Sequence, residues 1–286
     1  MPGAVVICFI WLGGVLLAGS AVAGMAPRWD LSRRRWSLHR VTASIDAVSA
    51  QFGRLTTGLF LLLMGWATTI IICWYLGELA QALEDAVDWP LFDWAQAHQV
   101  AGGWSSAWQT ITNIGSPMIT GYAAAIGAVV FAIIWRIRGL RWWVPGVTVW
   151  GGLVLVRYAQ FLLKEVVDRG HPPTTLGTWP SGGCARVLVI YGLILFFATL
   201  CLHPKGARPW VAWATATAFL TSVQGYARLY NLEHWFTDVV GGIVFGVLII
   251  SLMIAFYFVI ERSPQRPIVR GLGKHASASP VGIAAE

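Results

Sequence analysis

The run VVGGIVFGVLIISLMIAFYFVI, residues 239–260, contains no charged side chain. A transmembrane helix needs about 20 consecutive apolar residues, because the hydrocarbon core of a bilayer is about 30 Å thick. Directly before it stands ARLYNLEHWFTD, residues 227–238, in which an arginine, a histidine and an aspartate occur close together. The sequence therefore predicts a membrane-spanning helix that has a cluster of polar residues at its N-terminal end.

The composition of the whole chain is typical of a membrane protein. Of its 286 residues, 57% are hydrophobic and 12% are charged, whereas soluble domains average about 25% charged residues. Seven apolar stretches are long enough to cross a bilayer; they are residues 4–25, 57–81, 117–135, 142–163, 184–202, 210–227 and 239–260. We therefore predict an all-α fold, a polytopic membrane helix bundle of about seven transmembrane helices.

The first stretch has a second interpretation. Ala21-Val22-Ala23 is similar to the small-residue site at which signal peptides are cleaved. No basic residue precedes the apolar run, however, and cleavage would leave the arginines of residues 28–40 outside the cell. A retained transmembrane helix is the favoured interpretation.

The basic residues between the stretches predict the orientation, because cytoplasmic connections carry an excess of Lys and Arg. These residues occur in the first, third and fifth connections and after the last span, at Arg28, Arg33, Arg34, Arg35, Arg40, Arg54, Arg136, Arg138, Arg141, Lys205, Arg208, Arg262, Arg266, Arg270 and Lys274. The second connection instead carries Glu84, Asp85, Asp88 and Asp93. We expect an extracytoplasmic N-terminus, a cytoplasmic C-terminus, and second, fourth and sixth connections outside. The net charge of +7 then indicates anchoring at the cytoplasmic membrane surface rather than nucleic-acid binding.

Three further segments carry expectations. Residues 87–116 mix aromatic and polar residues at helical spacing and predict an amphipathic helix in the outer interface, and residues 33–54 look like its cytoplasmic counterpart. The tail after residue 260 is rich in Pro, Ser, Gly and Ala and is predicted to be disordered. Cys8, Cys73, Cys184 and Cys201 show neither metal-ligand nor paired spacing, so we expect no metal, no cofactor and no disulfide.

The polar cluster before the last span suggests chemistry on a phosphate. His234 and Asp238 are four residues apart and share one face of a helical turn. The carboxylate can then hold one ring nitrogen while the other faces a substrate. Arg228, in the turn before them, is a fixed cation that can bind an anion beside that nitrogen.

The fourth connection, LLKEVVDRGHPPTTLGTWPSGGCARV at residues 162–187, supplies the second half of the constellation. Lys164, Arg169 and His171 stand at the end of one span, and Pro180-Ser181-Gly182-Gly183 stands at the start of the next. A Ser-Gly-Gly turn before a helix exposes backbone N–H groups that suit phosphate oxygens. Two outer loops are thus expected to provide cations, a hydroxyl and amides to one site.

Together these residues resemble the type 2 phosphatidic acid phosphatase superfamily, also called the lipid phosphate phosphatases. Its signature has three parts, K-x(6)-R-P, P-S-G-H and S-R-x(5)-H-x(3)-D. Arg228, His234 and Asp238 match the third part, and the surrounding H-W-x-T-D-V-x-x-G is typical of bacterial members. The resemblance covers approximately residues 55–260 and implies a six-helix core. It leaves residues 1–54 as an extra N-terminal transmembrane helix with a basic amphipathic segment, and residues 261–286 as a cytoplasmic tail.

The resemblance implies a two-step mechanism. His234 attacks phosphorus, Asp238 holds the imidazole in the useful tautomer, and water then hydrolyses the phosphohistidine. The equatorial oxygens are stabilised by the side chains and amides of Lys164, Arg169, Ser181, Gly182, Gly183 and Arg228. The implied substrate is a phospholipid or a polyprenyl phosphate in the bilayer.

Three positions depart from the pattern. His171 stands at the arginine of the first part, Gly183 at the histidine of the second part and Ala227 at the serine of the third part. The family's second-part histidine is the proposed general acid, so its absence favours substrates whose leaving group needs little protonation, such as a polyprenyl diphosphate. His171 is a candidate substitute acid.

A non-enzymatic alternative remains open. The chain could be a catalytically impaired member that serves as a lipid-binding or accessory subunit of a membrane complex. The first span, with small residues at Gly13-Gly14 and Ala18-Gly19, suits packing against a membrane protein partner. A vanadate-dependent haloperoxidase shares the three-part site, but the resemblance places that activity mainly in soluble chains, which also use the missing histidine.

Overall fold

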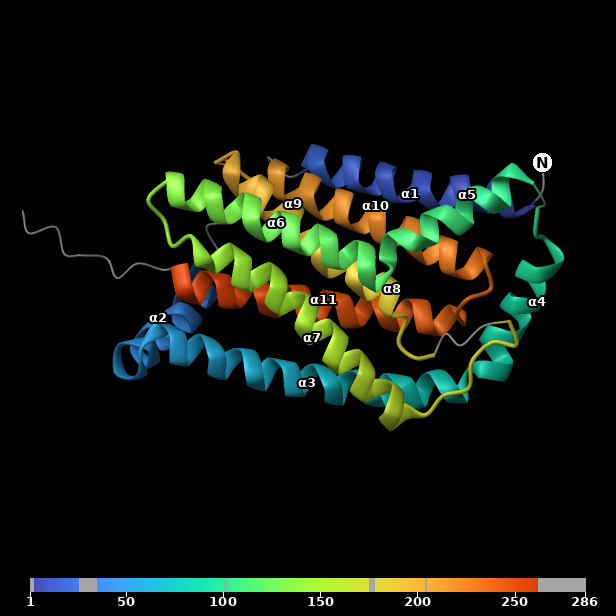
Figure 1. Ribbon diagram of the computed structural model, residues 1–286, viewed down its shortest axis with the longest axis horizontal. Helices are drawn as coiled ribbons and strands as arrows, with labels where there is room; N and C mark the ends of the chain where they lie inside the picture. Colours follow the sequence, from blue (N-terminus) through green and yellow to red (C-terminus); the bar gives the residue numbers. More distant parts are fainter. Residues whose placement is uncertain (1–2, 26–34, 101, 175–177, 204, 262–286) are drawn as a thin grey trace, which may run out of the picture.

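The computed structural model describes residues 3–25, 35–100, 102–174, 178–203 and 205–261, and their regular elements are helices (Figure 1). In chain order these are α1 Gly3–Met25, α2 Arg35–Phe52, α3 Arg54–Ala82, the π-helical turn η2 Glu84–Asp88, α4 Trp89–Ala97, α5 Gly103–Thr112, the short 3-10 turn η3 Asn113–Gly115, α6 Pro117–Ile137, α7 Trp143–Val167, α8 Gly182–Arg186, the π-helical turn η4 Val187–Tyr191, α9 Gly192–Cys201, α10 Arg208–Tyr230 and α11 Phe236–Glu261. The all-α polytopic bundle predicted from the sequence is confirmed.

Six helical stretches within the described residues are long and apolar enough to cross a membrane. They are Gly3–Met25, Arg54–Ala82, Pro117–Ile137, Trp143–Val167, Gly182–Cys201 and Phe236–Glu261. The stretch predicted at 210–227 forms α10, which has 23 residues but carries more hydroxyl and amide side chains than the others. Some of its polar groups bond within the protein: the Thr221 hydroxyl donates to the carbonyl of Thr217, and the Gln224 amide donates to that of Thr112. The prediction of about seven spanning helices is thus confirmed for six of them.

The last helix, α11, lies at the centre of the bundle. It contacts α3, α7 and α8, and Phe245, Ile249 and Met253 are buried on it. A helix that is apolar on all sides is expected to be enclosed. Burial of α11 fixes the position of its N-terminal turn, where Asp238 lies.

The connections fall at two ends of the bundle, as the sequence predicts. At one end, Arg138 donates to the carbonyl of Cys201 and Arg141 to that of Ile260. At the other end, Gln99 donates to the carbonyl of Tyr230. Which end faces the cytoplasm stays a prediction. Arg28, Arg33, Arg34 and the predicted disordered tail from Arg262 onwards lie outside the described residues.

The second connection crosses the end of the bundle as two helices, α4 and α5 (Figure 1). The prediction of one continuous amphipathic helix was wrong, because the segment forms two helices. The helix breaks after Ala97, and Gly102 has φ of 85°, a left-handed conformation that favours glycine. Within the basic segment predicted at 33–54, residues 35–52 form the helix α2. The four cysteines are free.

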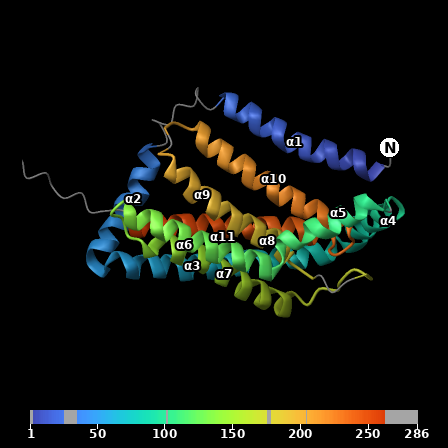
Figure 2. The same ribbon diagram turned by 45° about the horizontal axis from the view of Figure 1, so that its top comes forward.

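The N-terminal helix α1 packs alongside α10 (Figure 2). Near its start, the carbonyl of Ala4 accepts a hydrogen bond from the Tyr226 hydroxyl at 2.8 Å. Near its end, Gly19 lies so close to Thr215 that a side chain at Gly19 would clash. Gly13 and Gly14 have open space beside them. Gly19, one of the small residues predicted to pack against a partner protein, therefore packs against α10 of the same chain.

Candidate active site

His234 and Asp238 meet where α10 gives way to α11. Leu232 adopts a left-handed conformation with φ of 57° in the connection, and Asp238 lies in the first turn of α11. The Nδ1 atom of His234 is 3.4 Å from Oδ2 of Asp238, and the two residues are 8% and 0% exposed. Nε2 of His234 has no hydrogen bond to a described residue. The pair therefore presents Nε2 as the ring atom available to a substrate.

Arg169 joins this pair from the inside of the protein. Its side chain is fully buried, and NH1 donates to Oδ1 of Asp238 at 2.7 Å. NH2 pairs with the Asp88 carboxylate, and Nε lies 3.5 Å from Oε2 of Glu84. Arg169 was predicted to bind phosphate, but its guanidinium is occupied by protein carboxylates. It holds Asp238, and through Asp238 it orients His234.

Asp88, at the end of η2, is the residue that the sequence reasoning missed. It is 1% exposed, and its carboxylate accepts hydrogen bonds from the backbone N–H of Thr237 at 2.9 Å and from the Thr237 hydroxyl at 2.6 Å. In the sequence it is one of four acids in the second connection. Asp88 is followed by Trp-Pro and has no basic residue nearby in the sequence. This was only a weak signal that its cationic partner comes from a distant part of the chain.

Arg228 lies close enough to His234 to act on it electrostatically. Its NH1 pairs with Glu233, and its NH2 donates to the carbonyl of Thr112 at 3.3 Å. Its Nε is buried without a hydrogen-bond partner among the described residues. A Cβ atom at Gly183 would lie 2.7 Å from this Nε, so the guanidinium occupies the space that a side chain at residue 183 would need.

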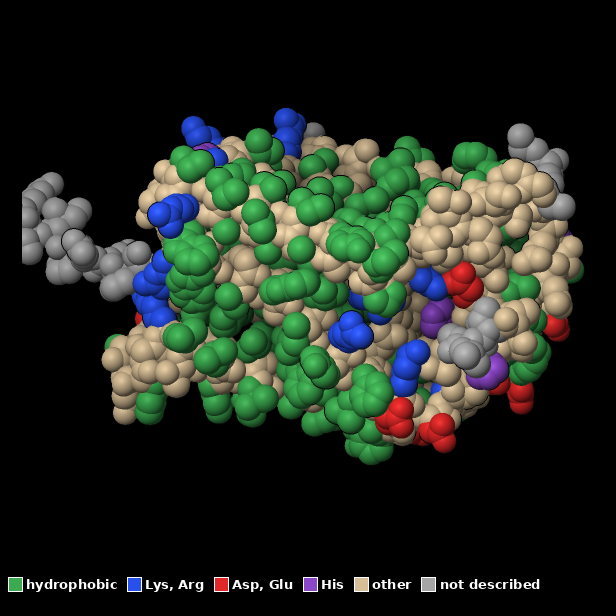
Figure 3. Space-filling model, in the orientation of Figure 1, with side chains coloured by type: hydrophobic (Ala, Val, Ile, Leu, Met, Phe, Trp, Pro, Cys, Tyr) green, Lys and Arg blue, Asp and Glu red, His purple; other side chains and the backbone are tan. Residues whose placement is uncertain are grey.

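A second group of cations extends the site along α7. Lys164, Arg157 and Arg186 line a pocket of about 250 Å³ with Gln160, and Gln160 accepts a hydrogen bond from Arg186 at 3.0 Å. Lys164 interacts electrostatically with Asp238 and Arg186. Figure 3 shows Lys and Arg side chains among hydrophobic ones near the middle of this face. The sequence reasoning missed Arg157 and Arg186 because they lie inside apolar stretches, although charges at membrane depth are costly and usually functional.

Ser181 and Gly182 form the turn that enters α8. The backbone N–H of Ser181 donates to the carbonyl of Asp238 at 3.0 Å, and its hydroxyl lies 3.5 Å from the Cys184 sulfur. Ser181 occupies the N-cap position, but its side chain does not cap the helix. Gly182 lies against Gln160, which leaves no room for a side chain there. The predicted Ser-Gly-Gly turn therefore lies beside the histidine–aspartate pair.

His171 is exposed, and its Nδ1 lies 2.8 Å from the carbonyl of Pro172. Within the described part of the chain, the structure gives no contact between His171 and the His234–Asp238 pair. Lys164, Arg228, Ser181 and the two glycines lie near that pair. The candidate substitute acid, His171, does not.

Burial favours the neutral form of the His234 imidazole. Loss of solvation lowers the pKa of its imidazole, Asp238 opposes this by hydrogen bonding and charge, and Arg228 and Lys164 lower the pKa further. A neutral imidazole is the form that can act as a nucleophile.

No group of three or more His, Cys, Asp or Glu side chains that could hold a metal occurs within the described residues.

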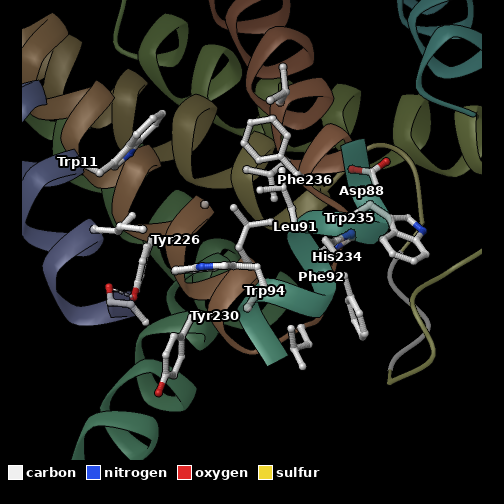
Figure 4. A pocket seen from close by; sticks show the side chains of 18 of the residues that line it. Trp11, Asp88, Leu91, Phe92, Trp94, Tyr226, Tyr230, His234, Trp235 and Phe236 are labelled. Atoms are coloured by element: carbon white, nitrogen blue, oxygen red, sulfur yellow. Dashed lines mark hydrogen bonds between the residues drawn. The ribbon is translucent and has the colours of Figure 1, made fainter. Parts of the chain in front are cut away.

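An apolar cavity of about 480 Å³ opens beside His234 (Figure 4). Its walls come from α1, α4, α10 and α11, and aromatic side chains contribute much of the lining. The site thus combines a buried histidine, cations on one side and an apolar space on the other.

Comparison with known proteins finds a family similarity in the C-terminal part of the chain. Residues 170–262 match the model of the PAP2 superfamily. The similarity to this family is shown for that segment, which is about one third of the chain. The matched segment contains His234 and Asp238 and ends with α11.

A solved structure of similar fold is that of the transmembrane PAP2 type phosphatidylglycerolphosphate phosphatase from Bacillus subtilis. It is 20% identical, with a TM-score of 0.54, and the match covers 69% of this chain and 98% of that chain. At this identity the likeness concerns the fold. No curated protein sequence matches the chain at a significant level.

Proposed function

We propose that this chain is a PAP2-type membrane lipid phosphatase that acts through a phosphohistidine on His234. The observation that supports this most is the arrangement around the imidazole. Nδ1 faces Asp238, Nε2 carries no hydrogen bond to a described residue, and cations gather on the substrate side. The site is proposed to face the extracytoplasmic leaflet.

In the first step, the Nε2 lone pair of His234 forms a bond to phosphorus. The bond between phosphorus and the leaving oxygen breaks, and that oxygen departs with the electron pair. Asp238 stabilises the positive charge that develops on the ring, and Lys164 and Arg228 stabilise the equatorial oxygens. In the second step, water attacks phosphorus, and His234 regains its neutral form when inorganic phosphate leaves.

We propose further that a lipid diphosphate, such as a polyprenyl diphosphate, is preferred over a monoester. An alkoxide leaving group needs a proton, and a general acid contributes roughly 10² to 10⁴ in rate. Gly183 carries no acid, and the adjacent space holds the Arg228 guanidinium. A phosphate leaving group is a weaker base and depends less on that proton. The surplus of cations at Arg157, Lys164 and Arg186 also favours a highly charged headgroup.

The test is phosphate release by the purified full chain, in nanodiscs, from paired lipids that differ in carrying one or two phosphates. We expect kcat/KM for the diphosphate to exceed that for the monophosphate, and His234→Ala to remove both activities. Faster release from the monophosphate would contradict the diphosphate preference. Absence of release across the whole panel would favour the lipid-binding accessory role, with or without a protein partner on α1.

A further inference from the structure

The apolar cavity beside His234 is shaped in part by the N-terminal helix. Ala4, Ile7 and Trp11 line it, and their spacing of three and four residues places them on one face of α1. The opposite walls are α4, α10 and the first turns of α11 (Figure 4). Contacts with α10, such as the bond from Tyr226 to the carbonyl of Ala4, hold α1 in this position.

Three polar side chains that reach the cavity already have partners within the protein. The Asp88 carboxylate is bound by Arg169 and Thr237. The Tyr226 hydroxyl donates to Ala4, and the Tyr230 hydroxyl donates to the carbonyl of Val100 at 3.0 Å. Except at His234 and Ser222, the cavity therefore offers a ligand mainly hydrocarbon and aromatic surface.

The large side chains along this face of α1 and α4 are accessible despite being apolar. Ile7 and Trp11 are 47% and 54% exposed, and Leu91 and Trp94 are 42% and 36% exposed. The volume of about 480 Å³ lies within the roughly 300–1,000 Å³ that is usual for ligand pockets. This space is open to an apolar ligand.

We propose that the cavity holds the hydrocarbon chain of the lipid phosphate and that α1 is the wall that sets its chain preference. The inference rests on the proposed function, because the phosphate bound at His234 is covalently attached to that chain. The cavity is the apolar space that includes His234, so the chain can enter it while the phosphate contacts the ring. Burial of each methylene strengthens binding by roughly fourfold, which gives the cavity a strong effect on KM.

The first test changes the wall. Ile7→Trp narrows the cavity, and Ile10→Trp is the matched control, because Ile10 is 68% exposed on α1 and does not line the cavity. Phosphate release is measured for polyprenyl diphosphates that differ in chain length. We expect Ile7→Trp to raise the ratio of KM for the longest to KM for the shortest substrate by about tenfold, and Ile10→Trp to leave this ratio as in the wild type. An unaltered ratio in both variants would overturn the proposal.

The second test separates this proposal from the proposed function. The full-length His234→Ala variant is cross-linked to a polyprenyl diphosphate that carries a diazirine in its chain. We expect cross-links within residues 4–11 and 222–243. Cross-links confined to other lipid-facing helices, such as α3 and α6, would overturn the chain site even if the wild-type protein releases phosphate. Cross-links in the cavity without phosphate release by the wild type would instead reject the phosphatase and retain the chain site.

Discussion

The two sides of His234 differ in how far their charges are satisfied. On the inner side, Asp238 and Asp88 are both bound by the buried guanidinium of Arg169. On the outer side, Arg228 pairs with Glu233, and these two side chains are 16% and 18% exposed. The inner side is a fully buried set of ion pairs that fixes the ring, whereas the cation on the outer side stays partly accessible to an anion. The difference indicates which residues orient the nucleophile and which bind the substrate.

The largest expected effect comes from opening the inner network. Arg169→Gln leaves two buried carboxylates without a cation, and loss of one partner of a buried pair costs about 3–5 kcal/mol. We expect a large fall in the thermal unfolding temperature and in activity. Arg157→Gln is the matched control, since Arg157 is exposed on α7 and its loss should leave the unfolding temperature close to that of the wild type. If Arg169→Gln weakened lipid binding without lowering stability, Arg169 would bind the substrate rather than orient His234.

A smaller effect is expected at Asp88, which reaches the ring only through its neighbours. Asp88→Asn removes the charge that holds Arg169 but keeps an acceptor for Thr237. We expect kcat to fall by up to about 10²-fold, the cost of a misplaced catalytic group, with little change in KM. Asp85→Asn, on an exposed acid in the same turn, should have the activity of the wild type. Equal kcat values in the two variants would show that Asp88 does not help to position His234.

On the outer side, Gly183→Ala tests the position of Arg228. The added Cβ would lie 2.7 Å from Nε of Arg228, and a flexible arginine can yield without unfolding the protein. We expect kcat/KM to fall by about tenfold, less than the about 10²–10³ for loss of a whole donor. Gly121→Ala, where nothing lies within 4 Å of the added atom, is the control. Unchanged kinetics in Gly183→Ala would contradict the role given to the Arg228 guanidinium.

The smallest effect is a shift in pH dependence. Burial lowers the pKa of His234 below its ordinary value of about 6.5, so the acid limb of the kcat/KM profile should lie below that pH. Because the unfolded chain binds the proton more readily, the stability contributed by His234 is complete above about pH 6.5 and is lost as pH falls toward the folded pKa. Lys164→Gln removes a cation that lowers this pKa and should move the acid limb to higher pH. A limb that does not move would show that Lys164 lies too far away to act on the ring.

Much of this comparison could be predicted from the sequence, because local spacing determines it. The apolar run at 239–260 and the i, i+4 spacing of His234 and Asp238 follow from helix geometry. Asp88 could not be assigned, since 149 residues separate it from Thr237 and the packing of η2 against α11 brings them together. Arg169 was assigned to phosphate because a cation next to a signature position does not reveal which anion it binds. The lining of the cavity by α1 depends on contacts with α10 that no periodicity indicates.

The central claim is that His234 becomes phosphorylated. Purified full chain in nanodiscs is mixed briefly with a lipid diphosphate labelled in its terminal phosphate, quenched at alkaline pH and digested for mass spectrometry. We predict an acid-labile phosphoryl group on His234, absent from His234→Ala. Phosphate release by the wild type without label on His234 would contradict the account.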